Sequence, residues 1–565
     1  MQKPYAAEDD EHQLALDPVT FEVIRNALRN TTEEMAITVR RAAYSTNIKT
    51  RADFSCAFFD TKLRSVAQSF AQPAHLVSMY TIVPLTVREV GAAEMKAGDT
   101  YLVNDPHRGS SHLNDIAVIS PVDVDGHRVG YVANMAHHVD VGGSAPASLG
   151  VSRELMQEGI ILPPTRVARD GEIEANVLNL ILANLRSPRE TGGDLRAQMS
   201  ANVVGARRMA SLVEQHSRET LESFYDELIA YTDRWTDREI RKLPEGVFEA
   251  EGFRDDDGIS DEPVHLKAKV IIADGHVRLD VGGSAPQRRA PLNCTRSMTL
   301  STVAFAVRCL VDDRIPVNDG FLNHVHVDGP DELICTARPP AGVVGGWELC
   351  MLLTDLILKA LHPALPGRIP AASKGLVVNL GFGGHDPHRD EYYVYMETIA
   401  GGYGARPDKD GQDASQTHIQ NTENAPIEEV ELNYPILISR YELIEDSAGA
   451  GRFRGGGGVR RDFTFPYAAA SCTILSDGRK FPPWGLEGGL EGRAAHFIFD
   501  PGGENKDLPS KHTFDMPKGG TLRVETPGGG GFGDPQARDP GAIERDVRDG
   551  KVSEAWARSC SNGGT

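Results

Sequence analysis

The sequence has no long apolar run and no excess of positive charge. No segment approaches the eighteen consecutive apolar residues that a membrane-spanning helix needs, and the first residues, MQKPYAAEDDEHQ, are acidic rather than typical of a signal peptide. The net charge of −21 would repel nucleic acid and anionic membrane surfaces. We therefore expect a cytoplasmic protein that binds small molecules or other proteins, and neither nucleic acid nor a membrane.

Cysteine is scarce, and the common catalytic motifs are missing. The seven cysteines are odd in number and contain no Cys-x-x-Cys, which is typical of reduced thiols without a structural zinc. There is no Gly-x-Ser-x-Gly and no His-Glu-x-x-His. Glycine-rich stretches occur (GFGGH, AGGYGARP, GRFRGGGGVRRDF, PGGGGFGDP), but none leads into a helix with the Lys-Ser/Thr of a nucleotide loop, so we read them as turns and bulges.

The chain is long enough for several domains, with 565 residues and 40% hydrophobic content. Asp17 and Pro18 predict the start of a helix that runs to about Tyr44. Its apolar face, expected in the core, consists of Val19, Val23, Ile24, Leu28, Met35, Ile37 and Val39. Helical patterns recur at 173–185, 193–243, 293–310 and 346–361, separated by strand patterns. We predict an α+β fold with mixed helices and β-sheets: a metal-bearing domain (1–245), a central α/β segment (246–375), a glycine-rich β domain (376–540) and a tail (541–565).

Histidine and aspartate are concentrated between Thr100 and Pro146. Two β-branched stretches, Ile116–Val124 and Arg128–Met135, flank Asp125-Gly126, a dipeptide that favours a tight hairpin turn. The open end of such a hairpin brings His112 and Asp115 beside the segment that holds His137 and His138. Two imidazoles and a carboxylate are suitable ligands for a divalent metal, and three protein ligands leave positions for water or substrate.

The register of this hairpin decides which histidine joins the site. With a two-residue loop Asp115 lies opposite Ala136, and with one extra residue it lies opposite His137; Pro121 hints at an edge or a bulge. Both His137 and His138 therefore stay as candidates. The alternative to a metal site is a polar loop whose histidines cap strand ends by hydrogen bonding.

Charged and polar side chains alternate just before the apolar strand Phe54–Phe59. Asn47, Lys49, Arg51 and Asp53 would project from one side of an extended segment. An Asp beside cations is either a structural ion pair or part of a site.

A repeated heptapeptide helps to distinguish structural residues from candidate metal ligands. DVGGSAP occurs at 140–146 and again at 280–286, each time after a strand, an Asp-Gly turn and a second strand. The second copy has no histidine pair before its Asp, so we read Asp140 as a structural turn residue. The histidines that occur only before the first copy are therefore the stronger candidates for functional residues.

Many long motifs, in order along nearly the whole chain, resemble the hydantoinase B/5-oxoprolinase family. They include RADFSCAFFD, NDPHRGSSHLND, ANMAHHVDVGG, ARPPAGVVGGW, GGYGARPDKDGQDA, NTENAPIEEVELNYPILISRYELIEDSAGAGRFRGGGGVRRDF and PGGGGFGDP. The family contains B subunits of ATP-dependent hydantoinases and caprolactamase, and the related subunit of acetone and acetophenone carboxylases.

The resemblance implies a partner and a site. A separate hydantoinase A-like ATPase subunit, in an A2B2 heterotetramer, would bind ATP and phosphorylate the substrate's carbonyl oxygen, while this chain completes the reaction at one divalent metal (Mn, Zn or Fe). The matching metal ligands are His112, Asp115 and His137, and Asp53 matches a catalytic Asp of cyclic-amide-hydrolysing relatives. His107 departs from the family pattern, where an aromatic residue follows NDP, and it would add a ligand or tune the pocket.

The resemblance further implies hydrolysis of a cyclic amide. A metal lowers the pKa of a bound water from about 15.7 toward 7, so hydroxide becomes available for ring opening. Asp53 would orient the water or accept its proton, Lys49 or Arg51 would stabilise leaving phosphate, and His138 is a reserve proton carrier. The alternative is a subunit of an ATP-dependent ketone carboxylase, in which the same metal would hold an enolate while carbon dioxide is captured.

Overall fold

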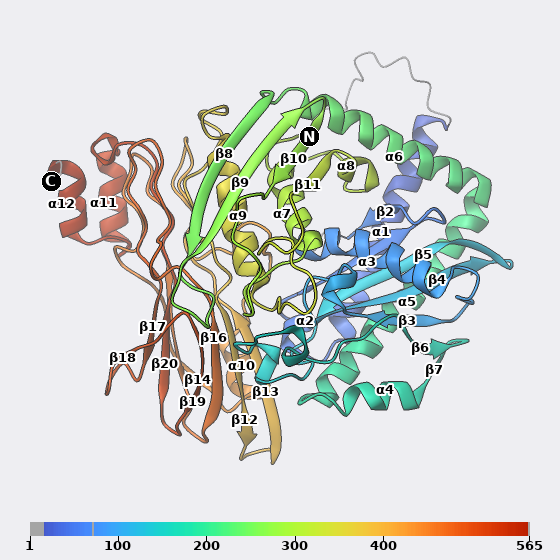
Figure 1. The fold of residues 1–565 in the computed structure, drawn as a ribbon, viewed down its shortest axis with the longest axis horizontal. Coiled ribbons are helices and arrows are strands. Elements are labelled where there is room, and N and C mark those ends of the chain that lie inside the picture. Colours follow the sequence, from blue (N-terminus) through green and yellow to red (C-terminus); the bar gives the residue numbers. More distant parts are fainter. Residues whose placement is uncertain (1–15, 70–72, 563–565) are drawn as a thin grey trace.

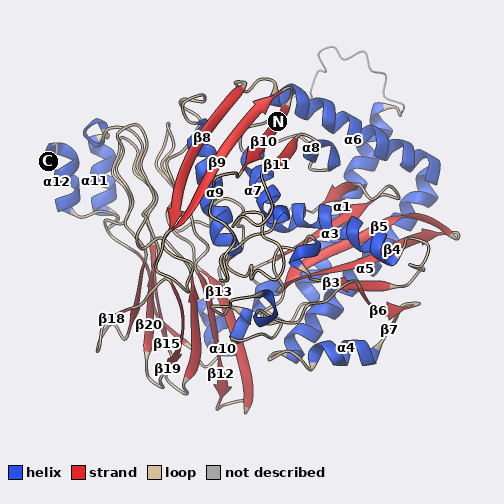
Figure 2. Ribbon diagram, viewed as in Figure 1, coloured by secondary structure: helices blue, strands red, loops and turns tan. Residues whose placement is uncertain are grey.

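The computed structural model describes residues 16–69 and 73–562 and is built from helices and four β-sheets. Figure 1 shows the chain colours passing from one region to the next, and Figure 2 shows that helices gather around the N-terminal and central sheets while the C-terminal region is mostly strand and loop. The α+β prediction is confirmed. Within the described residues, no helix is long and apolar enough to cross a bilayer.

The N-terminal region contains a seven-stranded antiparallel sheet whose centre is the predicted hairpin. The strand order is β2-β1-β5-β4-β3-β6-β7. Helices cover both faces, so the central strands are buried nearly throughout. The strands are β1 (Phe54–Phe59), β2 (Ser65–Gln68), β3 (Thr100–Val103), β4 (Asp115–Val124), β5 (His127–His137), β6 (Thr165–Arg169) and β7 (Glu172–Ile173).

The first helix, α1 (Pro18–Ala42), begins as predicted: the Asp17 carboxylate accepts hydrogen bonds from the amides of Val19 and Thr20. Its apolar face is only partly the one expected. A stripe containing Ile24, Leu28, Met35 and Val39 is buried against α5, whereas Val19, Val23 and Ile37 are 73%, 50% and 49% exposed. These three residues lie about 100° or more around the helix from the stripe, because each residue advances by about 100°.

The remaining helices of this region pack on the two faces of the sheet. The helical pattern predicted over 193–243 is two helices, since Ser217 takes a φ of 66° between them, and Pro188 serves as the first residue of the earlier one. The helices are α2 (Thr46–Lys49), α3 (Pro73–Val90), α4 (Ala175–Leu182), α5 (Pro188–His216) and α6 (Arg218–Ile240), with 3-10 turns η1 (Pro106–Arg108), η2 (Pro146–Ser148) and η3 (Leu155–Gln157).

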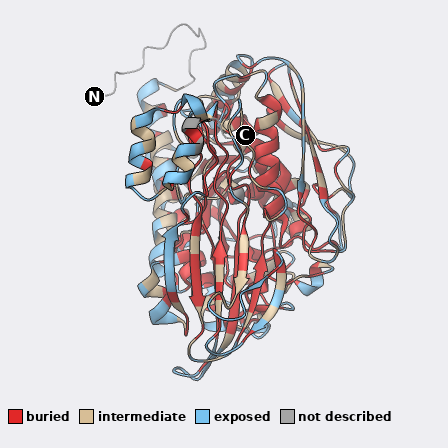
Figure 3. Cartoon of the chain, turned by 90° about the vertical axis from the view of Figure 1, so that its left-hand side faces the viewer, coloured by how far each residue is buried: buried red, intermediate tan, exposed pale blue. Residues whose placement is uncertain are grey.

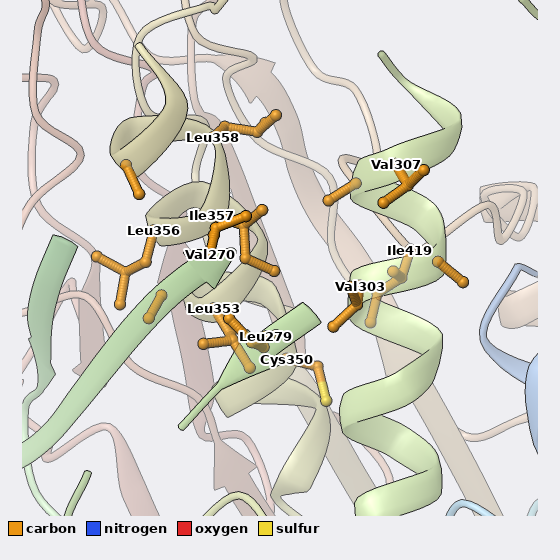
Figure 4. Packing of buried hydrophobic residues seen from close by; sticks show 14 of the residues in the cluster. Val270, Leu279, Val303, Val307, Cys350, Leu353, Leu356, Ile357, Leu358 and Ile419 are labelled. Atoms are coloured by element: carbon orange, nitrogen blue, oxygen red, sulfur yellow. The ribbon is translucent and has the colours of Figure 1, made fainter. Parts of the chain in front are cut away.

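The central region is a four-stranded sheet in the order β11-β10-β9-β8, with two helices against one face. Figure 4 shows side chains of α7 and α9 meeting those of β9 and β10, for example Val303, Leu353, Val270 and Leu279. The elements are β8 (Gly246–Arg254), β9 (Val264–Ala273), β10 (His276–Asp280), α7 (Arg296–Arg308), α8 (Asp319–Leu322), β11 (Val325–Asp328) and α9 (Gly346–Leu361). Both predicted helices are present, and they form the largest apolar cluster of the described chain.

The C-terminal region is a β-sandwich. Its sheets run β13-β12-β16-β19 and β14-β15-β20-β17-β18, and residues of both, such as Phe382 and Phe463, share one core. Figure 3 views this region face on and shows buried strand interiors. The elements are β12 (Asn379–Asp386), β13 (Glu391–Thr398), α10 (Ile427–Asn433), β14 (Leu437–Leu443), β15 (Val459–Thr464), β16 (Ala470–Leu475), β17 (His496–Phe499), β18 (Lys506–Asp507), β19 (Lys511–Met516), β20 (Thr521–Glu525) and η4 (Pro535–Ala537).

The glycine-rich segments pack backbone against backbone above this sandwich. A Cβ added at Gly455 would lie 1.9 Å from the carbonyl oxygen of Gly529, so only glycine permits this approach. The tail forms α11 (Pro540–Arg548) and α12 (Glu554–Asn562), and Asp546 ties it to Arg454 and Arg538 by ion pairs. The exact domain boundaries remain a prediction.

Candidate metal centre

The hairpin β4–β5 decides the register that the sequence left open. Asp125 and Gly126 have φ angles of 50° and 78°, as a two-residue hairpin turn requires. The register shifts by one residue near the turn, because Val122 pairs with Gly130 while Asp123 pairs with Arg128. This extra residue places Asp115 directly opposite His137. Of the two registers considered, the bulged one is present.

Three donor atoms meet at the open end of this hairpin. His112 Nε2 lies 2.9 Å from His137 Nδ1 and 3.4 Å from Asp115 Oδ1, and His137 Nδ1 lies 2.9 Å from the same oxygen. All three residues are buried. Within the part of the chain that the structure describes, this is the single group of three or more His, Cys, Asp or Glu residues placed to hold a metal ion.

The donor set fits a divalent ion. Two ligands that each lie about 2.1 Å from one ion are about 3.0–3.4 Å apart at octahedral or tetrahedral angles, which matches the three separations. Protons alone satisfy such a cluster poorly, since each can bridge only one pair of atoms. A neutral imidazole pair with one carboxylate suits Mn²⁺, Fe²⁺ or Zn²⁺.

A further histidine, His75 on α3, joins the cluster. Its Nε2 lies 3.3 Å from Asp115 Oδ2 and 3.7 Å from Asp53 Oδ1, so it stands between the two carboxylates. His75 was not among the predicted residues, because nothing in an amphipathic helix marks one histidine as facing a site. Asp53 itself is buried at this pocket, and its carbonyl accepts the amide hydrogen bond of His137.

The charges of the cluster reinforce one another. Burial tends to raise the pKa of Asp115, but His112 and His75 beside it, with hydrogen bonds from the histidines, hold that pKa well below its usual range. Burial tends to lower the pKa of His75, but Asp115 and then Asp53 raise it above the ordinary value. Ser111 also donates a hydrogen bond to Asp115. The carboxylate is therefore kept ionised, the form that binds metal.

The segment 47–53 is not extended as predicted. Residues Thr46–Lys49 form a helical turn, so Asn47 and Arg51 share a side and their side chains meet at 3.3 Å. Arg51 is fully buried and donates to the Met396 carbonyl and the Thr398 hydroxyl, which lie in the pocket wall. Lys49 is exposed, so it does not belong to the pocket.

Two other histidines lie elsewhere. His138 projects from the opposite face of the hairpin from His137, because successive strand residues alternate, and its Nε2 lies 2.9 Å from Gln198 Oε1 on α5. The structure therefore places His138 in a buried polar contact with α5 and not among the residues that line the pocket. His107 Nε2 contacts the Ala341 carbonyl at 3.3 Å and is outside the metal group. Asp140 is a turn residue as predicted, bonded to Gly142 and Arg186.

The pocket above the donor atoms is small, with a volume of about 40 Å³. Its lining combines the cluster with a mostly apolar wall: Asp53, His75, His112, His137, Trp347, Met351, Val377, Asn379, Met396, Thr398, Ile419 and Gln420. Gln420 also lines a larger cavity of about 650 Å³ among α1, α3 and α7. The site therefore lies where all three regions of the chain meet.

Comparison with known proteins assigns the class of the chain. The model of the hydantoinase B/oxoprolinase family matches residues 17–535. The chain belongs to this family, which confirms the resemblance carried by the sequence motifs.

Two relatives and one solved structure are similar to this chain over nearly its whole length. The beta chain of the caprolactamase of Pseudomonas jessenii is 31% identical over 96% of this chain and 95% of its own. A solved structure of the ATP-dependent caprolactamase from that organism has a TM-score of 0.88 at 28% identity, covering 96% of both chains. The B chain of a putative D-/L-hydantoinase from a Pseudomonas strain is 29% identical over 96% of this chain and 94% of its own.

An acetone carboxylase structure shares the fold. It has a TM-score of 0.87 and 18% identity, covering 97% of this chain and 80% of that chain. At this identity the likeness concerns the fold alone.

Proposed function

We propose that this chain is the ring-opening subunit of an ATP-dependent cyclic amide hydrolase. The observation that carries the proposal is the buried convergence of His112, Asp115 and His137, with His75 and Asp53 alongside. Relatives named as a caprolactamase subunit and a hydantoinase subunit support amide hydrolysis over other reactions.

In this proposal His112, Asp115 and His137 hold one divalent ion. The ion would supply Lewis-acid activation of water and polarisation of a carbonyl group. The ionised Asp115 contributes the negative charge of the ligand set. A buried wall that includes Met351 and Val377 excludes bulk water from the reacting atoms.

His75 and Asp53 would accept the proton that the attacking water loses. His75 Nε2 lies within 3.7 Å of carboxylate oxygens of both Asp53 and Asp115, so a proton taken from the attacking water can be shared along this line. Asp53, which lines the pocket, orients that water by accepting its hydrogen bond. Both residues lie beside the ligands rather than among them.

The activation step belongs to a partner. An amide is a poor electrophile, and phosphorylation of its carbonyl oxygen by a hydantoinase A-like ATPase subunit would activate the carbonyl carbon. Addition of one water and cleavage of the ring C–N bond would then leave an acyl phosphate, which a second water hydrolyses to the carboxylate and inorganic phosphate. The relatives are named as subunits, which supports a partner chain, and we propose an A2B2 assembly of the two. The buried guanidinium of Arg51, behind Met396 and Thr398, would favour an anionic phosphorylated ligand in the pocket.

The test is reconstitution with the A-like subunit, ATP, and a panel of hydantoins, 5-oxoproline and lactams. We expect ring-opened product and inorganic phosphate in equal amounts, with at least one oxygen of ¹⁸O-labelled water in the new carboxyl group. Asp115→Asn should abolish product formation while the partner's ATP binding persists. ATP turnover that depends on bicarbonate and a ketone, without ring opening, would contradict the proposal in favour of the carboxylase.

A further inference from the structure

Trp347 makes an unusual hydrogen bond at the metal centre. Its indole Nε1 donates to Nδ1 of His112 at 2.8 Å, and the ring closes one side of the pocket with only 9% of its surface exposed. An indole N–H is a donor only. Nδ1 of His112 therefore carries the lone pair in this contact, and in a neutral imidazole the proton is then on Nε2.

This hydrogen bond conflicts with metal binding. Nε2 is the His112 atom that faces Asp115 and His137, so it must offer its lone pair to the ion, and the imidazole proton must then move to Nδ1. Two N–H groups would face each other across the 2.8 Å contact. A metal-bound histidine usually directs its second nitrogen at an acceptor instead. The hydrogen bond and the ion exclude each other.

The backbone on both sides of Trp347 is held in place. Glu158 accepts hydrogen bonds from the amides of Val343 and Val344 at 3.0 and 3.1 Å, just before α9. Glu348, the next residue, accepts from the amides of Val377 and Val378 at 3.0 and 3.1 Å. These hydrogen bonds hold the backbone beside Trp347, so relief of the conflict would fall to the indole side chain and not to a shift of the helix.

The small volume of the pocket also favours a movement of the Trp347 indole. Its volume of about 40 Å³ holds little more than water, whereas small-molecule sites usually measure about 300 Å³ or more. The cavity of about 650 Å³ that shares Gln420 lies next to it. An indole that turns away from His112 leaves space for a ligand over the donor atoms.

We infer that Trp347 is a ligand-binding residue whose indole N–H is released from His112 when the ion binds, and which then donates to a carbonyl or phosphoryl oxygen of the substrate. The inference rests on the metal of the proposed function. It assigns Trp347 to recognition of the reacting group, through a donor that is available only in the loaded site.

The first test uses ¹⁹F NMR of the full chain labelled with 5-fluorotryptophan. The chain has four tryptophans, and the Trp347 resonance can be assigned with Trp347→Phe or by elimination with single Phe variants at 235, 484 and 556. After metal removal by chelation, Zn²⁺ alone should shift one resonance, that of Trp347. Inorganic phosphate added to the Zn²⁺-loaded chain should shift it again. An unmoved Trp347 resonance at either step overturns the corresponding half of the inference.

The second test asks whether Trp347→Phe raises or lowers the affinity of the chain for Zn²⁺. Removing an ordinary partner of a metal-binding histidine weakens metal binding by about 10–100-fold. Trp347→Phe instead removes a competitor, so Zn²⁺ should bind about threefold to tenfold more tightly, as expected for loss of one opposing hydrogen bond. Trp484→Phe is the matched control, since that ring stacks under Lys359, and it should leave the affinity unchanged. Equal or weaker binding by Trp347→Phe overturns the inference.

These results separate the two proposals. A wild-type chain that binds no Zn²⁺, Mn²⁺ or Fe²⁺ contradicts the metal of the proposed function. A chain that binds metal at His112 without a response at Trp347 contradicts the inference alone.

Discussion

The hairpins β4–β5 and β9–β10 turn at the same Asp-Gly dipeptide and run into the same heptapeptide, DVGGSAP. Asp125 and Gly126 have φ angles of 50° and 78°, and Asp274 and Gly275 have 52° and 75°. The first Asp of each heptapeptide accepts a hydrogen bond from the glycine amide two residues later, at 3.0 and 2.8 Å. The same local sequence thus gives the same turn and the same Asp–Gly hydrogen bond, although a bulge shifts the register of β4–β5 and not that of β9–β10.

The surroundings of the two hairpins differ. Hairpin β4–β5 lies at the centre of a seven-stranded sheet with apolar clusters on both faces, so side chains on both sides of its strands are buried. In β9, buried and half-buried residues alternate, because only one face of that sheet is covered. The candidate metal centre lies at the hairpin with both faces enclosed, where a buried cluster of imidazoles and carboxylates is shielded from water.

The largest expected contrast is in metal binding. Asp115→Asn should weaken binding of Zn²⁺ or Mn²⁺ by at least about 100-fold, because it removes the one charged ligand. His276→Ala is the matched control in the second hairpin: its Nδ1 lies 3.1 Å from His326 Nε2, but no third ligand completes a group there among the described residues. Metal content by plasma mass spectrometry tests both. Metal loss in the His276 variant would break the contrast.

Substitutions of His137 and His138 should differ in their effects on metal affinity and on the free energy of unfolding. His138→Ala leaves Gln198 Oε1 without its partner and opens a cavity, so it should lower the free energy of unfolding by about 3 kcal/mol while metal affinity stays within about twofold. His137→Ala should lose the metal instead. Urea unfolding and metal titration of the two variants give the comparison, and metal loss in the His138 variant would contradict the assignment of opposite faces.

The paired aspartates of the heptapeptides should differ in stability effect. Asp140 is fully buried and also accepts from the Arg186 amide and side chain, whereas Asp280 is half-buried and 3.7 Å from Lys269. We expect Asp140→Asn to cost about 3 kcal/mol of unfolding free energy and Asp280→Asn about 1 kcal/mol or less. Equal costs would show that the turn, and not its surroundings, sets the energy.

The glycines of the two turns give the smallest contrast. Gly126→Ala meets no atom within 4 Å and should cost about 1 kcal/mol from the positive φ alone. A Cβ at Gly275 would lie 2.0 Å from Asp237 Oδ1, so Gly275→Ala should cost about 2 kcal/mol. Thermal unfolding of the two variants measures the difference, and a larger cost at Gly126 would be the contrary result.

Much of the site was predictable because it depends on a hairpin. The Asp-Gly turn fixes which strand ends meet, so His112, Asp115 and a histidine of the pair 137–138 were identified from counting alone. Counting could not choose between His137 and His138, because the choice depends on the bulge at Val122/Asp123, which the alternation of residues does not reveal. The expected extension of 47–53 was wrong, since a single helical turn there depends on the contacts of Arg51 with β13.

The sequence by itself determined the α+β class, the start of α1, the Asp-Gly turns and the structural role of the DVGGSAP aspartates, because each follows from local backbone preferences and hydrogen bonds within a few residues. Only the tertiary structure decided that His75 joins the cluster, that His138 and Lys49 do not, and that Trp347 contacts His112. Trp347 and His112 are 235 positions apart in the chain, and such meetings are set by how helices pack against sheets, which no local pattern encodes.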